Sequence, residues 1–381
     1  MTRSYLIVLS SLAVLASVWI RYDPTILLKI PVVGSIPYML LFRKSMYIDL
    51  SAWQRDEMKT WVRDGDVIVA AAAKSGTTML LYMSHLIRVR GDIEKYPFRE
   101  VNVATPWPSI MHYPGQTWKE LKELMNTTVL HDGQRLKQYW DHVDYPYRIF
   151  KSHETPVMYD DMVGVNGYVA MESNVLDVRA FSKLRFVAMT RDLPDALASL
   201  YPFPTNHDHD FVNIWGGFPP KFISVDHLVY TFLFMKGISR LHHTFCGYTL
   251  NWWKLRHEPN VLLLHYNEAI EDRRSLIRKL AAFYNQKLTD WEVDKIYSLS
   301  SIEAMRETGD QFNYQLWGNK NFRNGTGTCM KSGKLLRKGV VGDSKLIFTD
   351  SHQQMLREFE DDFYGTSEDG VAAKLFSRQN A

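Results

Sequence analysis

The stretch DVIVAAAAKSGTTM, residues 66–79, predicts a buried strand that turns directly into a helix. Its first half is apolar without alternation, as in a parallel strand that is covered on both faces. Gly76 permits a tight turn. Apolar residues at helical spacing follow this turn, at Met79, Tyr82, Met83 and Leu86. The amides of residues 75–78 then lie at a helix N-terminus, which attracts anions, and Lys74 adds a full positive charge. We therefore expect this turn to hold a phosphate group.

The composition is that of a globular chain with little net charge. With 381 residues, of which 46% are hydrophobic and 13% aromatic, the chain can bury one large core. A formal net charge of +3 is too small to predict a nucleic-acid partner. Two cysteines, Cys246 and Cys329, exclude a disulfide framework, and we expect free thiols, although a single bridge stays open.

The amino terminus, residues 1–45, predicts a membrane anchor. Tyr5–Ile20 is a run of apolar and small residues between Arg3 and Arg21, slightly shorter than the roughly 20 residues that span a bilayer. A second apolar stretch, Thr25–Phe42, is interrupted by Pro and Gly, which is typical of a monotopic or re-entrant element. We favour an anchor over a cleaved signal peptide, which remains the alternative.

We expect the protein on the endoplasmic reticulum or Golgi membrane, and the charges near these segments indicate on which side of the membrane the catalytic domain lies. Cationic residues after the first apolar segment outnumber those before it, which favours a catalytic domain in the cytosol. Two glycosylation sequons, at Asn126 and Asn324, favour the lumen if they are used. A lumenal orientation therefore stays open.

Beyond residue 60, strand and helix candidates alternate without repeats or linkers, which predicts a single α/β domain. We assign residues 46–365 to this domain, with a P-loop-like open parallel sheet flanked by helices, and residues 366–381 to a tail. The expected strands are Val67–Ala72, Tyr147–Phe150, Leu184–Thr190 and Val261–Tyr266. The expected helices include one from Asp192 through Leu200, one over Arg273–Asn285 and one that starts at a capping box, Thr289–Glu292.

Polar residues gather at the ends of the predicted strands. Lys151, Ser152 and His153 follow the second strand, and Arg191 follows the third, with Ser199 eight residues later. A histidine at one strand end alone is more often structural than catalytic. In an open parallel sheet, however, ligands bind beyond the carboxyl ends of the strands, so this combination predicts one anion-binding site.

These motifs together resemble those of the sulfotransferase family that uses 3′-phosphoadenosine 5′-phosphosulfate (PAPS), and its cytosolic branch most. The resemblance covers about residues 60–350. The family's Pro-Lys-Ser-Gly-Thr-Thr-Trp loop, its Lys-Thr-His strand end, its Arg-then-Ser motif and its terminal Arg-Lys-Gly-x-x-Gly-Asp signature are matched by residues 73–79, 151–153, 191–199 and 337–349.

The resemblance implies in-line transfer of a sulfuryl group from PAPS to a hydroxyl acceptor, which leaves 3′-phosphoadenosine 5′-phosphate (PAP). It makes His153 the general base, while Lys74 holds the leaving phosphate oxygen and Lys151 steadies the sulfuryl oxygens. No metal is needed. The implied donor-binding positions are Lys74, Ser75, Gly76, Thr77, Thr78, Met79, Arg191, Ser199, Tyr266, Ser300, Ile302, Arg337, Lys338 and Gly339.

The sequence departs from the family pattern at the adenine site and at the dimer motif. Met79 and Ile302 stand where the family stacks the adenine between aromatic rings, although Tyr266 is retained. Methionine still packs on a purine face. The family's dimerisation motif is altered over Lys345–Gln354, which puts dimerisation by that surface in doubt.

Aromatic insertions suggest a small, apolar acceptor with a hydroxyl group, such as a sterol or a phenol. The candidate wall residues, each equally consistent with core packing, are Trp107, Tyr113, Trp118, Tyr147, Phe203 and Trp215.

Two other functions stay open. A P-loop small-molecule kinase is disfavoured because no carboxylate motif for magnesium accompanies the loop, and an inactive nucleotide-binding relative because Lys74 and His153 are both present. The run Asn206–Asp210 invites a metal interpretation, but we favour a solvated loop.

Overall fold

The computed structural model of the chain describes residues 61–108, 110–113, 115–153, 178–215, 219, 221–234, 243–318, 322 and 325–378. The expected anchor over residues 1–45 lies outside these ranges, as does the sequon at Asn324. Within them, no helix is both long enough and apolar enough to cross a bilayer.

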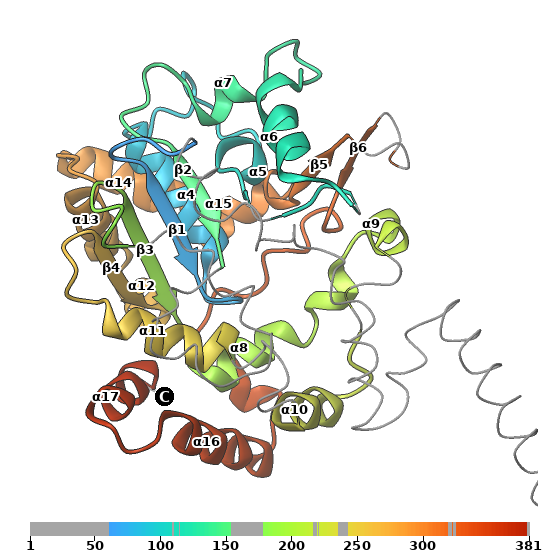
Figure 1. Ribbon diagram of the computed structural model, residues 1–381, viewed down its shortest axis with the longest axis vertical. Coiled ribbons are helices and arrows are strands. Elements are labelled where there is room, and N and C mark those ends of the chain that lie inside the picture. The colour runs from blue at the N-terminus through green and yellow to red at the C-terminus, as the bar shows by residue number, and fades with distance from the viewer. Residues whose placement is uncertain are drawn as a thin grey trace, which may run out of the picture.

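A parallel sheet with the strand order β2-β1-β3-β4 forms the centre of the described structure (Figure 1). Its strands are β1 (Val67–Ala71), β2 (Ile149–Ser152), β3 (Arg185–Thr190) and β4 (Val261–His265). All four were expected from the sequence. β2 starts two residues later than predicted and includes Lys151 and Ser152, because their backbones pair with Val69 and Ala70. The open parallel sheet confirms the predicted α/β fold class.

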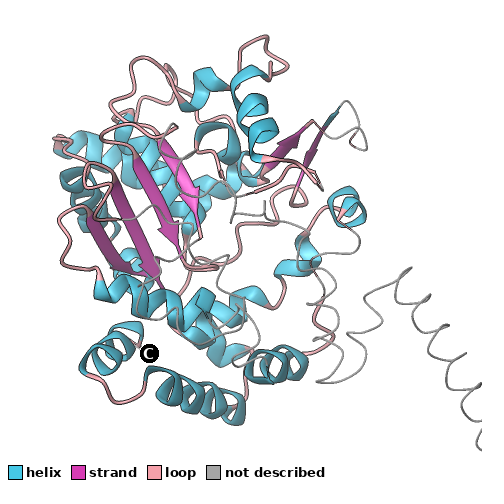
Figure 2. Cartoon of the chain, in the orientation of Figure 1, coloured by secondary structure: helices cyan, strands magenta, loops and turns pink. Residues whose placement is uncertain are grey.

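Helices occupy most of the connections between the strands (Figure 2). They are α4 (Thr77–Arg88), α5 (Val101–Ala104), α6 (Trp118–Thr127), α7 (Lys137–Trp140), α8 (Leu193–Leu200), α9 (His209–Ile214), α10 (Val225–Phe234), α11 (Tyr248–Lys254), α12 (Tyr266–Glu271), α13 (Arg273–Phe283), α14 (Asp290–Leu299), α15 (Ile302–Glu307), α16 (Asp350–Tyr364) and α17 (Glu368–Ser377). A short antiparallel ribbon pairs β5 (Gln315–Trp317) with β6 (Thr326–Thr328).

Four helices predicted from the sequence are confirmed, namely α4, α8, α13 and α14. The capping box of α14 forms as expected, because Thr289 and Glu292 each accept a backbone N–H from the other residue. α8 begins after Asp192, but the carboxylate of Asp192 caps no backbone amide. It is buried instead against Arg357, which donates to it over 2.5 Å.

Helices α4 and α11 pack directly on the strands of the sheet. α4 contacts β1 and β2 and packs against α13 and α14, while α11 contacts β3 and packs against α17 (Figure 1). The core strand residues of β1 are fully buried, as the unbroken apolar run predicted.

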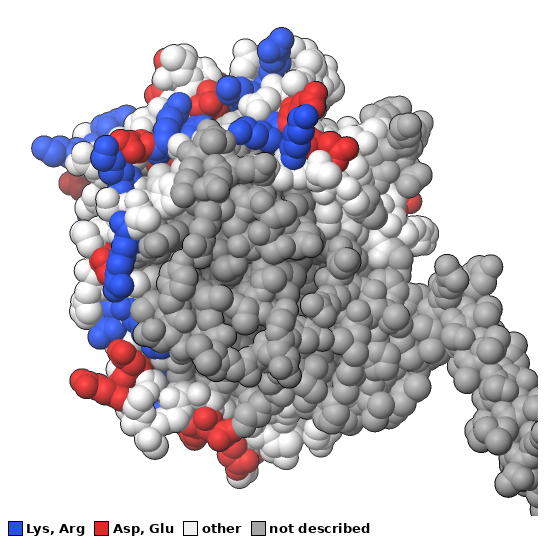
Figure 3. Space-filling view, viewed as in Figure 1, with Lys and Arg blue, Asp and Glu red and all other residues white. Residues whose placement is uncertain are grey.

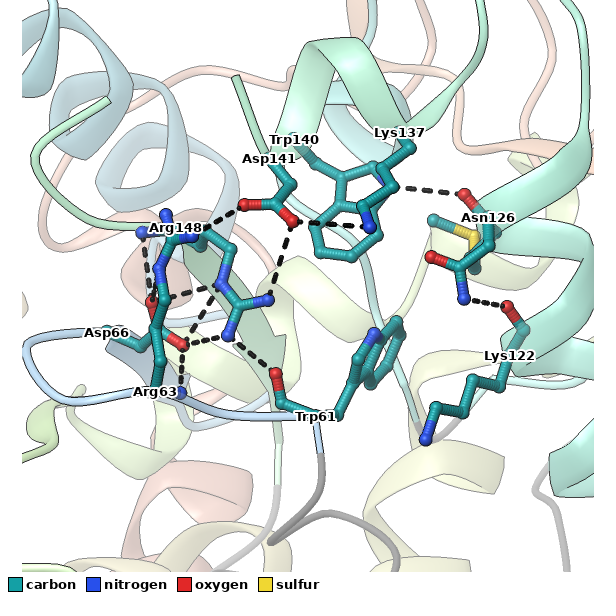
Figure 4. Close-up of polar contacts among 10 residues, drawn as sticks. Trp61, Arg63, Asp66, Lys122, Asn126, Lys137, Trp140, Asp141 and Arg148 are labelled. Carbon is teal, nitrogen blue, oxygen red and sulfur yellow. Dashed lines mark hydrogen bonds and ion pairs between the residues drawn. The ribbon is translucent and has the colours of Figure 1, made fainter. Parts of the chain in front are cut away.

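The amino-terminal end of the sheet is closed by a buried ion pair (Figure 4). Asp66 has no exposed surface, and its carboxylate accepts from the guanidinium Nε and Nη2 of Arg148 and from two backbone amides, those of Arg63 and Arg148. Arg148 also donates to the carbonyl of Trp61. Every oxygen of the carboxylate is thus hydrogen-bonded, which anchors the start of β1 to the start of β2.

The segment that we expected to be a tail, residues 366–381, contains the packed helix α17. The carbonyl of Ser377 accepts from His265 Nε2 at the end of β4, and the ring of Phe376 contacts Trp253. Arg378 adds an ion pair to the buried Glu360 of α16. The described part of this segment is therefore attached to the domain.

Charged side chains on the face shown in Figure 3 are of both signs. Lys and Arg follow one edge of the described surface, and Asp and Glu gather below them over the carboxyl-terminal helices. The two cysteines are free and buried, which confirms the expectation of free thiols.

Candidate active site

The loop between β1 and α4 has an unusual backbone, as the opening sequence predicted. Lys74 has a φ of 63° and Gly76 a φ of 88°, both in the left-handed region. A Cβ at Gly76 would lie 3.1 Å from the ring of Tyr266 and 3.3 Å from Met189 Sδ. Gly76 is therefore required both for its conformation and for the close approach of the Tyr266 ring.

The amino-terminal end of α4 is open to an anion. Gly76 is its N-cap and supplies no side-chain cap, and no acidic residue lies in the first turn. The side chain of Ser75 is buried, and its hydroxyl has no hydrogen-bond partner among the described residues. Because no side chain among the described residues caps this end, the first amides remain available to an anionic ligand.

His153 follows β2 and has a defined tautomer. Its Nδ1 lies 2.8 Å from the carbonyl oxygen of Ala71, and since a carbonyl only accepts, Nδ1 carries the proton. Burial, then the charges of Lys151 and Lys74, lowers the pKa of His153 to about 3. The imidazole is thus neutral at pH 7, with its lone pair on Nε2.

Lys151 lies between two aromatic rings. Its Nζ is 3.6 Å from the ring centroid of Trp107 and 3.8 Å from that of Tyr314. The ring of Trp107 also meets His153 edge to face at 5.0 Å. Trp107 and Tyr314 therefore fix the ammonium group beside the imidazole by cation–π contacts.

Arg191 follows β3 and is held by a carboxylate that the sequence analysis missed. Its Nη2 lies 3.3 Å from Asp195 Oδ2 and donates to the carbonyl of Val340 over 2.9 Å. Asp195 also accepts the amides of Gly342 and Ser344, at 2.7 and 2.9 Å. One buried carboxylate thus joins Arg191 to the carboxyl-terminal signature. The only sequence signal for it is its position four residues after Arg191.

The signature itself contributes two more cations. The carboxylate of the buried Asp343 accepts from Arg337 Nη1, and from Lys338 Nζ over 2.7 Å. Gly339 has a φ of 68°, and its α-carbon faces Ile302 closely. This turn therefore places Gly339, the residue after Lys338, against the position where the family pattern has an aromatic.

One cavity of about 480 Å³ brings these groups together. Of the predicted site residues only Ser75 is absent from its lining. Those that line it are Lys74, Gly76, Thr77, Thr78, Met79, Lys151, His153, Arg191, Ser199, Tyr266, Ser300, Ile302, Arg337, Lys338 and Gly339. The structure therefore assembles the candidate site from four strand ends and the carboxyl-terminal signature.

The cavity carries an excess of positive charge. Burial, then the charges of Arg337 and Arg191, lowers the pKa of Lys74 to about 7. The buried Nε atoms of Arg191 and Arg337 have no hydrogen-bond partner among the described residues. Donors left unpaired beside mutually repelling cations fit a ligand with more than one anionic group.

The predicted acceptor walls are partly wrong. Trp107 and Phe203 line the cavity, as expected. Trp118 packs on Trp61, Tyr147 on Tyr284 and Trp215 on Phe211, all in the core, and Tyr113 lies beside Gly318. Composition alone does not show which face of each segment is turned inward, so core aromatics were mistaken for pocket walls.

The cavity also includes residues that the sequence did not assign to the site. They are Ile110, Leu200, His207, Met305, Tyr314, Cys329, Met330, Leu335 and Leu336. His207 donates from Nδ1 to the carbonyl of Phe203, and burial together with nearby Lys74 lowers its pKa to about 4. These residues come from segments without a motif, which is why no pattern indicated them.

The run Asn206–Asp210 is a helix start. Asp208 accepts the amides of Asp210 and Phe211 and thereby caps α9. Within the described residues, no group of three or more His, Cys, Asp or Glu side chains could hold a metal ion.

Comparison with known proteins identifies the family. A family model described as a sulfotransferase domain matches residues 64–367, so the chain belongs to the sulfotransferase family and is a sulfotransferase enzyme. Sulfotransferase 2A1 of Rattus norvegicus is 26% identical over 299 residues, which cover 77% of this chain and 82% of that protein. The 3-beta-hydroxysteroid sulfotransferase of Cavia porcellus is 32% identical over 143 residues, or 38% of this chain and 45% of that protein.

Solved structures share the fold. Retinol dehydratase in complex with androsterone and inactive cofactor PAP aligns with a TM-score of 0.54 at 17% identity, over 81% of this chain and 82% of that chain. Mouse sulfotransferase SULT7A1 complexed with PAP aligns with a TM-score of 0.50 at 18% identity, over 82% and 89%. The family and fold predicted from the motifs are thus confirmed, and the reaction class is sulfuryl transfer to a hydroxyl acceptor.

Proposed function

We propose that this enzyme uses PAPS as sulfuryl donor and a lipophilic alcohol of the sterol class as acceptor, with His153 as general base. The observation that carries this proposal is the single cavity, in which a neutral imidazole lies beside two lysines, between a cationic region and an apolar one. The hydroxysteroid and retinol-binding relatives support an acceptor of this kind.

The cationic region fits both anionic groups of PAPS. Lys74 and the open end of α4 would hold the 5′-phosphosulfate, and Lys74 would stabilise the leaving oxygen. Arg191 and Arg337 would hold the 3′-phosphate, which would give their unpaired Nε atoms acceptors. The neighbouring cations of the cavity thus match the two anionic groups of one ligand.

The catalytic region fits removal of a hydroxyl proton. His153 would accept this proton at Nε2, since Nδ1 donates to Ala71. Lys151, fixed between Trp107 and Tyr314, would face the sulfuryl oxygens in transit. The negative charge of a bound donor offsets the charges of Lys74 and Lys151, and this raises the pKa of His153 towards the range of a general base.

Transfer of labelled sulfate from PAPS tests the proposal. Wild type and His153→Ala are compared on a sterol, a phenol, an amine and a sugar, with PAP binding measured by calorimetry on both proteins. We expect transfer to the sterol, and a loss of roughly 10³-fold in His153→Ala with PAP affinity retained.

The other outcomes separate the alternatives. If wild type binds PAP and transfers sulfate to none of the four acceptors, the inactive-relative interpretation replaces ours. Activity that requires a nucleoside triphosphate and magnesium would establish the kinase instead. Transfer to the phenol or sugar alone would overturn the sterol assignment while leaving the donor assignment intact.

We further propose attachment to the endoplasmic reticulum or Golgi membrane through residues 1–45, with the catalytic domain in the cytosol. The apolar run Tyr5–Ile20 and the cationic residues after it support this proposal. The side-chain amide of Asn126, in one of the two sequons, donates to the carbonyl of Lys122 within α6.

Glycosidase treatment of the expressed chain tests the cytosolic orientation, because a mobility shift would place the domain in the lumen.

A further inference from the structure

The adenine end of the cavity lacks the aromatic pair of the family pattern. Met79 and Ile302 occupy those positions and line the cavity together with Ser300, Tyr266 and Arg273. A purine stacks best on a flat, polarisable surface, and Met79 offers it only a flexible thioether and Ile302 only a branched aliphatic group. Some other planar group must therefore supply this contact if the donor is to be held firmly.

Every aromatic residue among the described lining residues already carries a cation. Lys74 Nζ lies 3.9 Å from the ring of Phe203, Lys151 Nζ lies over Trp107 and Tyr314, and the guanidinium of Arg191 lies 4.2 Å from the ring of Tyr266. One face of each ring is thus occupied. The lining also includes the guanidinium of Arg273, which, unlike those of Arg191 and Arg337, pairs with no carboxylate among the described residues.

Arg273 is held in place by a ring rather than by a carboxylate. It is the first residue of α13, and its guanidinium carbon lies 4.2 Å from the ring centroid of Tyr297. Among the described residues it forms no ion pair, whereas its neighbour Arg274 pairs with Asp294 at 2.8 Å. The Tyr297 ring supports the Arg273 guanidinium, and Arg273 also lines the cavity, where a ligand can reach it.

We propose that Arg273 stacks on the adenine base of the donor, in place of the missing aromatic residues. Arginine guanidinium planes stack on nucleobases as aromatic rings do. Tyr297 then acts as a positioning residue, because it orients the guanidinium from behind. This inference rests on the proposed use of PAPS, and it assigns a role to a residue that no motif includes.

Binding of two nucleotides tests the stacking contact directly. Calorimetry compares PAP with ribose 3,5-bisphosphate, which has both phosphates and no base, on wild type, Arg273→Ala, Arg273→Lys and Arg274→Ala. We expect Arg273→Ala to weaken PAP binding roughly 10-fold and to leave the base-free probe unchanged. Arg273→Lys, which keeps the charge and loses the plane, should behave like Arg273→Ala.

The control variant and the probe make each outcome decisive. Arg274 also lies over Tyr297, at 3.9 Å, but does not line the cavity, so Arg274→Ala should bind both nucleotides like wild type. Equal weakening of both probes by Arg273→Ala would show that Arg273 acts as a phosphate cation and would overturn the stacking role. Unchanged PAP binding would overturn it too. If wild type itself binds no PAP, the donor assignment fails, and the inference fails with it.

Discussion

At the amino-terminal end of the sheet, the buried guanidinium of Arg148 meets a buried carboxylate, that of Asp66, whereas at the carboxyl end Lys74 and Lys151 meet aromatic rings. Both ends bury cations. At the carboxyl end Asp195 pairs with Arg191, and Asp343 pairs with Arg337 and Lys338, while Lys74 and Lys151 lie over rings. The buried Asp66–Arg148 pair fastens two strands and leaves no donor for a ligand. Lys74, whose pKa is lowered to about 7, gains its full charge when an anion binds beside it, so the carboxyl end is the one that can bind an anionic donor.

Breaking the buried pair should have the largest effect in the molecule. Asp66→Asn leaves the buried Arg148 guanidinium with the more distant carboxylate of Asp141, at 3.8 Å, as its ion-pair partner among the described residues, and we expect the free energy of unfolding to fall by about 3–5 kcal/mol. Urea denaturation measures this change. The exposed pair of Asp64 and Lys183, at 2.7 Å, offers a control, and Asp64→Asn should cost at most about 1 kcal/mol.

A double variant separates charge from packing at this end of the sheet. Asp66→Asn combined with Arg148→Met removes both charges and keeps most of the volume, so stability should largely return. A double variant no more stable than Asp66→Asn alone would mean that the hydrogen bonds to the backbone, and not the ion pair, fasten the strands.

Removal of a buried charge at the carboxyl end of the sheet should not destabilise the free enzyme. Lys74→Met removes a buried ammonium that Arg191 and Arg337 repel, so the unfolding free energy should be unchanged or rise by about 1 kcal/mol. PAP affinity should nevertheless fall roughly 100-fold, because a charge-assisted contact is lost. Calorimetry and thermal unfolding, measured on the same preparation, check both parts. A variant that loses stability and binding in parallel would contradict the contrast between the two ends.

The sequence predicted the contiguous parts of this comparison and missed the parts that are distant in the chain. Lys74, His153 and Arg191 were predictable because each directly follows a strand, and a parallel sheet gathers such residues at one edge. The Asp66–Arg148 pair joins residues 82 positions apart, which no local pattern encodes. The contact of Tyr314 with Lys151 was missed for the same reason, since Tyr314 comes from a distant segment without a motif.

Replacing Asp195 should have a smaller effect. Its carboxylate holds Arg191 and the backbone of the carboxyl-terminal signature in place, and other cations of the site keep their charge. In Asp195→Asn the side-chain NH₂ would face the Gly342 amide and Arg191, which are donors themselves. We expect PAP affinity to fall about 10-fold, near 1.4 kcal/mol. In kinetics this should appear as a raised KM for the donor, with kcat and the acceptor KM close to wild type.

The exposed Asp210 is a suitable control for this substitution, since it lies in the first turn of α9 and outside the cavity. Asp210→Asn should leave the donor KM unchanged. If Asp195→Asn instead lowers kcat and leaves the donor KM alone, Asp195 acts on the reacting groups and not on the 3′-phosphate site.

The smallest predicted effect comes from the titration of Lys74 at the carboxyl end of the sheet. Lys74 has a pKa lowered to about 7 in the free enzyme and near 10.5 when unfolded, so the unfolded chain holds more protons between these values. The free enzyme therefore gains stability from this group as pH rises from 7 to about 10.5.

A bound anion beside Lys74 raises its pKa again, so PAP binding at pH 8 should take up a fraction of a proton. Calorimetry in buffers of different ionisation enthalpy measures this uptake, which Lys74→Arg should abolish because arginine stays charged. Uptake that persists in Lys74→Arg would assign the proton to another group, whereas the Asp66–Arg148 end, already neutralised, should contribute none.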